Sequence, residues 1–244
     1  MPKSRIYLEQ TLATGERAVL PEAAFRHVVQ VLRLEVGEPL MLFNNQGGEY
    51  EAVLEVIGKR EAHVRVGAHQ VVNRESALNI TLIQGISKGE RMDWCVQKAT
   101  EIGVAGVVPV VTEHGAVKLD AERWARKREH WQGVVTSAAE QSGRTRVPNV
   151  APVADFQTAL KQTPADALKL ILDPDVESTL DSIKPSQNVV LLIGPEGGFS
   201  PAELSQAKQA GFLPLRLGPR ILRTETAATV AMTVLQTLWG DLKC

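Results

Sequence analysis

Cysteine is scarce in this sequence of 244 residues, and the two that occur, Cys95 and Cys244, lie far apart. They neither frame a disulfide scaffold nor have the short spacing of metal-binding cysteines. We therefore expect no metal site, and so little cysteine is typical of the reducing cytoplasm. Long apolar runs are missing too, since nothing approaches the roughly 20 residues that a membrane helix needs. The N-terminus also lacks an apolar signal core. The sequence thus predicts a cytoplasmic protein without a membrane partner.

An excess of charge of one sign is also absent. The formal net charge is −1, and residues 1–74 hold nine Lys or Arg and nine Asp or Glu. A nucleic-acid partner therefore cannot be inferred from overall charge, and any RNA site must be a local patch. Hydrophobic residues make up 44% of the chain and charged residues 23%, which is ordinary for a globular protein.

The first third of the sequence is predicted to be mainly β structure. Strand-like runs cover residues 39–44, 49–57 and 62–66. A turn of residues that tolerate positive φ separates the first two: Asn45-Gln46-Gly47-Gly48. Residues 22–34 have helical spacing, with four apolar side chains on one face: Phe25, Val28, Val29 and Leu32. A strand-rich unit of this size is expected to form a small barrel, because closure removes exposed strand edges.

Beyond a candidate linker at residues 71–76, apolar strands alternate with amphipathic helices. Strands are predicted at residues 78–84, 104–111, 168–172, 189–193 and 213–217. Helices are predicted at residues 90–102 and 120–142. Continuous apolar strands that alternate with helices indicate a mostly parallel sheet with helices on both faces. The expected fold class is therefore α/β.

The strand predicted at residues 189–193 runs directly into a glycine-rich turn, Gly194-Pro-Glu-Gly-Gly-Phe-Ser200. A helix then begins, with Ser200 as its N-cap, Glu203 completing a capping box and Gly211 as its stop. Such a turn at the carboxyl end of a parallel strand is where α/β sheets bind ligands. It lacks the spacing of a dinucleotide fingerprint and the lysine of a P-loop, and its glutamate would repel phosphate. A plain strand-to-helix turn stays open as the alternative.

A second loop follows the strand predicted at residues 213–217 and reads Gly218-Pro-Arg-Ile-Leu-Arg-Thr-Glu-Thr226. We expect Thr224 to be the N-cap of the next helix and Glu225 to suit the helix dipole. Core spacing along that helix is predicted for Ala227, Ala231, Val234 and Leu238. Three apolar residues fit either the wall of an adenine pocket or the core: Leu217, Ile221 and Leu222.

Together, the two loops resemble the signature of the SPOUT methyltransferases. More narrowly, they resemble the bacterial family that methylates N3 of a uridine in 16S ribosomal RNA. The residues that carry the resemblance are Ile193-Gly-Pro-Glu-Gly-Gly-Phe-Ser200 and Leu217-Gly-Pro-Arg-Ile-Leu-Arg-Thr-Glu-Thr-Ala227. Further matching segments are Phe25-Arg-His-Val-Val-Gln-Val-Leu-Arg33, Lys98-Ala-Thr-Glu-Ile-Gly103 and Ala139-Glu-Gln-Ser-Gly-Arg144. The resemblance spans nearly the whole chain.

The resemblance implies a PUA-like β-barrel at residues 1–72 that recognises RNA. It implies a SPOUT methyltransferase domain at residues 73–244 with a C-terminal trefoil knot. A homodimer, S-adenosyl-L-methionine as cofactor, and 16S rRNA of the small ribosomal subunit as substrate are also implied. The cofactor-binding residues expected from it are Leu172, Gly194, Glu196, Gly198, Leu217, Gly218, Ile221, Leu222 and Thr226.

Methylation of uracil N3 demands more than positioning, because N3 carries a proton and is a poor nucleophile until that proton leaves. The catalytic candidates are Arg223, Glu225 and Glu196. We expect the arginine to stabilise the uridine anion or to position a phosphate, and Glu225, or else Glu196, to accept the proton. The structural alternatives are an ion pair for Arg223, a helix-terminal charge for Glu225, and fixing of the turn for Glu196.

The basic side chains expected to contact RNA are Arg5, Arg26, Arg33 and Arg144, although charged residues are more often only solvated. Cys95 is interpreted as a small buried residue rather than a nucleophile, because it lies mid-helix beside core positions. Three other functions stay open. They are methylation of another rRNA or tRNA nucleotide, a non-catalytic RNA-binding module, and a nucleotide-binding enzyme whose first loop holds an anion. Cofactor binding distinguishes the last two from a methyltransferase.

Overall fold

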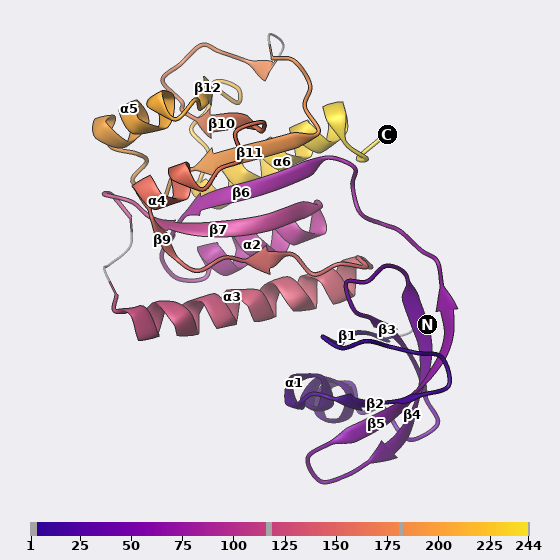
Figure 1. Ribbon diagram of the computed structural model, residues 1–244. Helices are drawn as coiled ribbons and strands as arrows, with labels where there is room; N and C mark the ends of the chain where they lie inside the picture. The colour runs from indigo at the N-terminus through magenta and orange to yellow at the C-terminus, as the bar shows by residue number, and fades with distance from the viewer. Residues whose placement is uncertain (1–3, 116–118, 181–182, 244) are drawn as a thin grey trace. The chain divides into compact units, whose positions relative to one another are not determined.

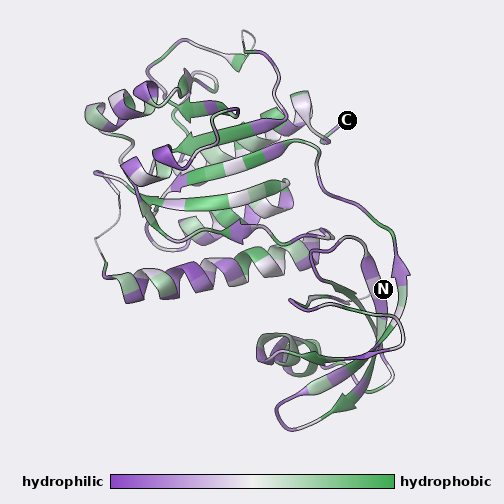
Figure 2. Ribbon diagram, in the orientation of Figure 1, coloured by the Kyte–Doolittle hydropathy of each residue, from purple (hydrophilic) through white to green (hydrophobic). Residues whose placement is uncertain are grey.

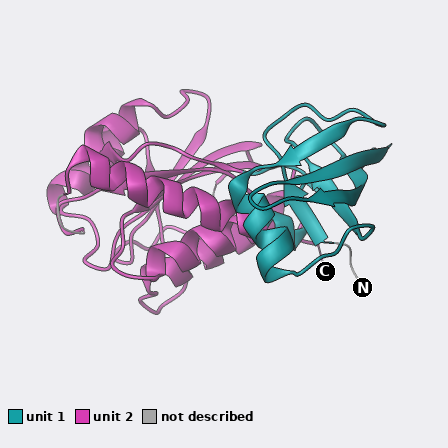
Figure 3. Cartoon of the chain, turned by 90° about the horizontal axis from the view of Figure 1, so that it is seen from below, with its two compact units in different colours: residues 1–75, 139–147 teal, residues 76–138, 148–244 magenta. Residues whose placement is uncertain are grey.

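The structure is a computed structural model that describes residues 4–115, 119–180 and 183–243. The chain forms two compact units (Figure 3). Unit 1 holds residues 1–75 together with 139–147, and unit 2 holds residues 76–138 and 148–244. The boundary lies at the end of the predicted linker, three residues beyond the expected domain border at residue 72. That residues 139–147 pack with the first unit was not predicted from the sequence.

Unit 1 is built on a five-stranded sheet in the order β1-β3-β4-β5-β2. Its strands are β1 (Ser4–Tyr7), β2 (Arg17–Leu20), β3 (Pro39–Phe43), β4 (Glu49–Ile57) and β5 (Ala62–Gln70). β1 and β3 are parallel, and the other neighbours are antiparallel. The sheet curls around an apolar core (Figure 1), and in the described part of the chain β1 and β2 form its edges. The three predicted strands, β3 to β5, are confirmed, and the sequence missed the two edge strands.

The predicted helix at residues 22–34 is two successive segments: α1 (Glu22–Phe25) and the π-helix η1 (Arg26–Val31). The N–H of Leu32 donates to the carbonyl of His27, five residues back, which is the π-helical hydrogen bond. Phe25 is buried as predicted, whereas Leu32 is exposed because the wider turn moves it off the predicted face. The chain then passes through Arg33 in left-handed backbone (φ 55°).

Unit 2 is built on a seven-stranded sheet in the order β12-β10-β11-β6-β7-β8, with β9 also paired to β7. Its strands are β6 (Asn79–Gly85), β7 (Val104–Val111), β8 (Asn149–Val150), β9 (Ala154–Asp155), β10 (Leu168–Leu172), β11 (Asn188–Ile193) and β12 (Leu213–Leu215). Every pairing in this sheet that the structure describes is parallel. The predicted parallel α/β sheet is therefore confirmed.

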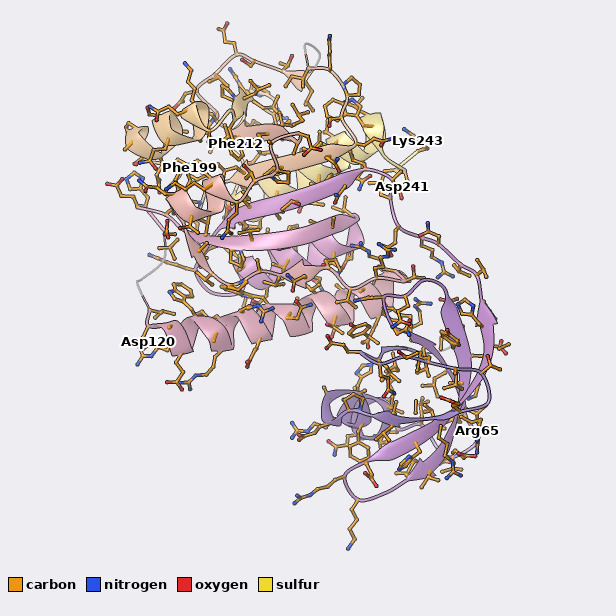
Figure 4. All side chains as sticks on the ribbon, viewed as in Figure 1. Arg65, Asp120, Phe199, Phe212, Asp241 and Lys243 are labelled. Carbon is orange, nitrogen blue, oxygen red and sulfur yellow. The ribbon has the colours of Figure 1, made fainter. Side chains whose placement is uncertain are left out.

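Helices cover both faces of this sheet (Figure 1). They are α2 (Arg91–Glu101), α3 (Ala121–Ser142), α4 (Phe156–Lys161), α5 (Pro201–Gln209) and α6 (Thr224–Trp239). α2 and α6 pack against each other, while α4 and α5 share a core with the sheet that includes Phe199 and Phe212 (Figure 4). α3 alternates hydrophilic and hydrophobic residues along its length (Figure 2), because one face is buried through Trp131, Val135 and Ala138.

The buried face of α6 differs from the predicted one. Of the predicted stripe, Ala231 is buried, but Leu238 is 54% exposed. The buried residues of the helix are Thr224, Ala228, Ala231, Met232, Leu235 and Gln236. α6 has apolar residues on more than one face, so its sequence pattern could not decide which face meets the sheet. The trefoil knot implied by the resemblance stays a prediction.

Among the described residues, no helix is both long enough and apolar enough to cross a membrane.

Candidate functional site

Unit 2 has a cavity of about 830 Å³ at the carboxyl edge of its parallel sheet. Three loops line it: residues 172–175 at the end of β10, 194–199 after β11 and 216–225 after β12. Parallel strands that end at one edge bring their loops together, which is why segments distant in sequence meet there. Cavities that take small-molecule ligands measure about 300–1,000 Å³, so this one is of ligand size.

The first loop has the local structure that the sequence predicts. The Ser200 hydroxyl accepts from the Glu203 N–H at 3.2 Å, and the Glu203 carboxylate accepts from the Ser200 N–H at 2.9 Å. This capping box fixes the start of α5. Gly198 has a φ of 67°, which favours glycine, and Gly211 ends the helix with a φ of 87°.

The residues expected to bind the cofactor converge on this cavity. Those that line it are Leu172, Gly194, Glu196, Gly198, Leu217, Gly218, Ile221 and Leu222. Thr226 is the exception, since it is not among the lining residues. Ile221 is 88% exposed, so its side chain forms an open rim rather than a covered wall. The cofactor roles of these residues stay predictions.

Glu196 is held in place by the start of α2 and the residues just before it. Its Oε1 accepts from Arg91 Nη1 at 2.6 Å and from the Lys88 N–H at 3.1 Å. Burial opposes its charge, but hydrogen bonds from its own backbone, Arg91 and Lys88 outweigh burial. They hold the pKa of Glu196 below its ordinary value. A carboxylate that is ionised and already bonded is a weak proton acceptor, so the structure favours the alternative in which Glu196 fixes the turn.

Glu225 has a different setting in the same cavity. It lies in the first turn of α6 and lines the cavity. Its Oε2 is buried and has no hydrogen-bond partner among the described residues. Buried polar atoms are nearly always bonded, so an unpartnered carboxylate oxygen at a cavity indicates a place for a ligand's donor or cation.

Cys95 is 2% exposed, and its thiol donates to Gln84 Oε1 at 3.2 Å. Burial, together with the nearby charge of Glu225, raises the pKa of Cys95 to about 12. The thiolate is the nucleophilic form, so this cysteine is not suited to nucleophilic catalysis. The interpretation of Cys95 as a small buried residue is confirmed.

Thr224 does not cap α6 as expected. The N-cap position is Arg223, without a side-chain cap hydrogen bond, and Thr224 is the first helical residue. Its hydroxyl instead donates to the carbonyl of Gly194 at 2.6 Å. The helix therefore begins one residue earlier than predicted, and the Thr224 hydroxyl bonds the first loop instead of capping α6.

Several charged residues that line the cavity were not predicted from the sequence: Arg91, Asp173, Asp175, Arg216 and Arg220. The two aspartates directly follow β10, so the rule that ligands bind beyond parallel strands could have identified them. Arg91 begins a helix in another part of the sequence, and only the packing of α2 brings it to the cavity.

In unit 1 the expected RNA-contact residues fall into two groups. Arg144 is 7% exposed and pairs with Glu75 through its Nε at 3.0 Å. Arg5 pairs with Glu49 and donates to the carbonyl of Arg144 at 2.7 Å. Burial and these bonds argue against direct RNA contact by Arg5 and Arg144. Arg26 and Arg33 are exposed.

Metal chemistry gains no support from side-chain clusters. Within residues 4–115, 119–180 and 183–243, no group of three or more His, Cys, Asp or Glu could hold a metal ion.

Two protein families match this chain. Residues 74–236 match the RNA methyltransferase domain, and residues 20–67 match the RNA methyltransferase PUA domain. The ribosomal RNA small subunit methyltransferase E of Buchnera aphidicola (subsp. Schizaphis graminum) is 34% identical over 98% of this chain and 97% of its own length. That of Bacillus subtilis is 31% identical over 86% of this chain and 85% of its own.

Two solved structures are similar over both units. A methyltransferase from Legionella pneumophila, in complex with bound cofactor SAM, has a TM-score of 0.95 and 42% identity, covering 99% of this chain and 100% of its own. A ribosomal RNA small subunit methyltransferase E from Neisseria gonorrhoeae, bound to S-adenosylmethionine, has a TM-score of 0.91 and 41% identity with the same coverage. The shared structure thus includes both the curled sheet and the parallel sheet.

Proposed function

Since the chain belongs to the family of the ribosomal RNA small subunit methyltransferases E, we propose that it transfers a methyl group from S-adenosylmethionine to N3 of a uridine in 16S ribosomal RNA. One observation carries the proposal: both glycine-rich loops and Glu225 line a single cavity of ligand size. The SAM-bound relatives, at 41% and 42% identity, support the cofactor.

The cavity fits this cofactor. Gly198 and Gly218 have open space where a Cβ would lie, with φ of 67° and 69°, so their backbone is accessible to a ligand. Leu172, Leu217 and Leu222 offer an apolar wall for an adenine ring. When bound, S-adenosylmethionine supplies a methyl group activated by a positively charged sulfur. The acidic side chains of Asp173 and Asp175 at the cavity suit that charge.

The chain's own residues must then remove the N3 proton and support the negative charge that remains on uracil. Glu225 is the acceptor that the structure favours, because its Oε2 is buried and free of partners in the described chain. Arg223 is exposed at the cavity edge, where its cation can stabilise the uracil anion or hold a phosphate. Glu196 orders the first loop through Arg91.

Unit 1 is proposed to recognise RNA. Residues 20–67 match a family described as an RNA methyltransferase PUA domain. Arg26, the first residue of η1, and Arg33, two residues beyond its end, are both exposed. Cations at such positions contact phosphates and set orientation, while sequence is read elsewhere.

We also propose that the protein is a homodimer to which α6 contributes. Large apolar side chains near the end of α6 are unusually accessible, with Leu238 54% and Leu242 42% exposed. Exposed apolar surface often marks an association site, and homodimers are mostly twofold symmetric. Sedimentation at micromolar concentration should give a stable dimer without RNA, and a stable monomer would contradict the proposed homodimer.

Two rival functions are less well supported. A nucleotide-binding enzyme would use the first loop for an anion, yet Glu196 places an ionised carboxylate there. A non-catalytic RNA-binding module would have no need for a cavity with a buried, unpartnered carboxylate oxygen. Both rivals predict that S-adenosylmethionine does not bind.

The proposed function has a direct test in two parts. Calorimetric titration of the purified protein with S-adenosylmethionine, without added metal, should show saturable binding. Mass-spectrometric mapping of 16S rRNA from a strain that lacks the protein should show the loss of one N3-methyluridine. Loss of a methyl group at another nucleotide would correct the target alone. No saturation up to millimolar cofactor would refute the methyltransferase assignment.

A further inference from the structure

We infer that Gln84 and Thr224 are positioning residues that hold the two cofactor loops at a fixed spacing through a chain of buried hydrogen bonds. The inference rests on the proposed function, because it concerns the loops that would hold S-adenosylmethionine. Neither residue belongs to the expected cofactor set, and Gln84 does not line the cavity.

The chain of hydrogen bonds begins at the end of β6. Gln84 is completely buried, and its Nε2 donates to the Thr224 hydroxyl at 2.9 Å and to the Gly85 carbonyl at 3.0 Å. The Thr224 hydroxyl then donates to the carbonyl oxygen of Gly194 at 2.6 Å. Gly194 is the first residue of the first loop and Thr224 lies near the end of the second, so the Thr224 hydroxyl bonds one loop to the other.

The direction of every bond in the chain is fixed. A threonine hydroxyl has a single hydrogen, and the Gly194 carbonyl accepts it, so Thr224 must accept from the Gln84 amide. This turns Oε1 of Gln84 toward Cys95, whose thiol donates at 3.2 Å. With its pKa raised to about 12 by burial and by the charge of Glu225, the Cys95 thiol keeps its proton. The polar groups of this hydrogen-bond chain are therefore all satisfied in one arrangement only.

This chain of hydrogen bonds lies where the strands of the sheet lead into the cofactor loops. Gln84 lies beside the end of β11, and a Cβ on Gly85 would lie 2.6 Å from the Pro195 ring, so β6 contacts the first loop directly. Thr224 connects the same point to α6, whose second residue is Glu225. A shift of Thr224 would therefore change the spacing of the loops and the position of the Glu225 carboxylate together.

A role in helix capping alone does not account for Thr224. α6 has no side-chain cap hydrogen bond at its N-terminus, and a threonine one position earlier could have supplied one. The hydroxyl instead reaches the opposite loop and completes a buried network. Such networks fix one geometry when they are fully satisfied.

Removal of the Thr224 hydroxyl tests the inference. Thr224→Val keeps the shape of the side chain, and Thr224→Ser keeps the hydroxyl. We expect Thr224→Val to raise the S-adenosylmethionine Kd about tenfold, the scale of one buried hydrogen bond, and to slow single-turnover methylation at saturating cofactor. Thr224→Ser should restore both, and RNA affinity should stay unchanged. Thr233→Val is the matched control, because the exposed Thr233 hydroxyl donates within α6, to the carbonyl of Thr229, and has no other partner among the described residues.

Gln84→Met is the second variant, since it removes the amide and keeps the length of the side chain. It should also raise the cofactor Kd. The inference is wrong if folded Thr224→Val and Gln84→Met bind cofactor within twofold of the wild type, or if Thr224→Ser is as impaired as Thr224→Val. The inference is equally wrong if neither variant folds, because the hydrogen bonds are then needed for folding and not specifically for the spacing of the loops. If the wild-type protein itself binds no S-adenosylmethionine, the proposed function fails first.

Discussion

At the scale of single residues, the cavity holds two carboxylates in different electrostatic environments. Glu196 accepts hydrogen bonds from Arg91 and Lys88, which keep its pKa low. Glu225 has a buried oxygen for which the described chain provides no partner. Carboxyl groups kept in unlike environments usually take unlike roles in a reaction. We therefore propose that Glu196 orders the loop and that Glu225 accepts the proton.

The change Glu225→Gln separates these two roles. The amide keeps the size of the side chain but cannot take a proton, so single-turnover methylation should fall by about 100-fold or more, the usual scale of a general base. The cofactor Kd should change little. Glu196→Gln should have the opposite profile, with a weaker Kd and a smaller loss of rate. Equal rates for Glu225→Gln and the wild type would remove Glu225 from the chemistry.

Gly198 gives a second test at this scale. A valine at its φ of 67° is strained and would project into the open space beside the first loop. Gly198→Val should therefore weaken cofactor binding at least tenfold by calorimetry. Gly211→Val carries a similar backbone strain at a φ of 87°, away from the cavity lining. This control should lower thermal stability but leave the Kd unchanged, and a matching loss of affinity in both variants would contradict the assignment.

At the scale of elements, a network of charges joins the parts of unit 1, and we call it the clamp: Arg5, Glu49, Arg74, Glu75 and Arg144. Arg5 on β1 and Arg74 both pair with Glu49 on β4. Glu75 pairs with Arg144 and accepts from the backbone N–H groups of Thr145 and Arg146. The clamp explains why residues 139–147, which include the last turn of α3, belong to unit 1 although the rest of that helix belongs to unit 2.

The clamp should make unit 1 sensitive to acid. Burial opposes the charge of Glu49, but hydrogen bonds and charge from Arg74 and Arg5 outweigh it and lower its pKa. A lowered pKa contributes stability that is present above the unfolded value, about 4.3, and is lost as pH falls through the folded value. Glu140 acts in the opposite sense, because burial raises its pKa and its contribution is lost as pH rises.

Glu49→Gln tests this dependence by urea unfolding between neutral pH and pH 3. The variant should be less stable at pH 7, because the partly buried Arg5 loses its counter-charge. Its free energy of unfolding should also fall less steeply below pH 4 than that of the wild type. Glu122→Gln, which removes the exposed pair with Arg126 on α3, is the control and should change little. Parallel pH profiles for Glu49→Gln and the wild type would exclude the clamp as the source.

Elements with a strong local signal could be predicted from the sequence, and those made by pairing could not. β7 and β10 have the predicted bounds because β7 is an uninterrupted apolar run and β10 is apolar except at Lys169. β8 and β9 have two residues each and become strands only by pairing with β7. α4 was missed, although Asp155 caps it through the Thr158 N–H at 2.9 Å. That cap was a readable signal.

The residues of the candidate site likewise include some that the sequence could predict and some that it could not. The lining glycines and leucines follow strands, so the order of the sequence placed them at the sheet edge. Arg91 and Gln84 reach the site only through the packing of α2 and the register of β6. The roles of Arg5 and Arg144 depend on carboxylates that lie far from them in the sequence. A pattern of charges along a chain does not tell which of them are buried in pairs.

At the scale of the whole molecule, a net charge of −1 gives no general attraction to RNA. Binding must then depend on a few exposed cations, each of which releases counterions from the phosphates it contacts. Because Arg5 and Arg144 are engaged in the clamp, Arg26 and Arg33 are the candidates that remain in unit 1. Of the four basic residues predicted to contact RNA, these two are therefore the ones whose substitution should reduce the salt dependence.

Substitution of these two arginines should therefore weaken RNA binding and reduce its salt dependence. For each phosphate contact that is lost, the slope of log Kobs against log salt should fall by about one unit. We choose Arg26→Ala and Arg33→Asn, because asparagine tolerates the left-handed backbone of residue 33 (φ 55°) better than alanine does. The cofactor Kd should stay unchanged, since the cavity lies in unit 2.

The control for Arg26 is Arg126 on α3, in unit 2. Both side chains are exposed, 65% for Arg26 and 68% for Arg126, and each pairs with a glutamate four residues earlier. Removing either arginine takes the same charge from the molecule and breaks the same kind of surface pair. If unit 1 recognises RNA, Arg26→Ala lowers the salt slope and Arg126→Ala does not. The reverse result would place recognition on α3, and equal slopes for all variants would show that neither surface contacts the phosphates.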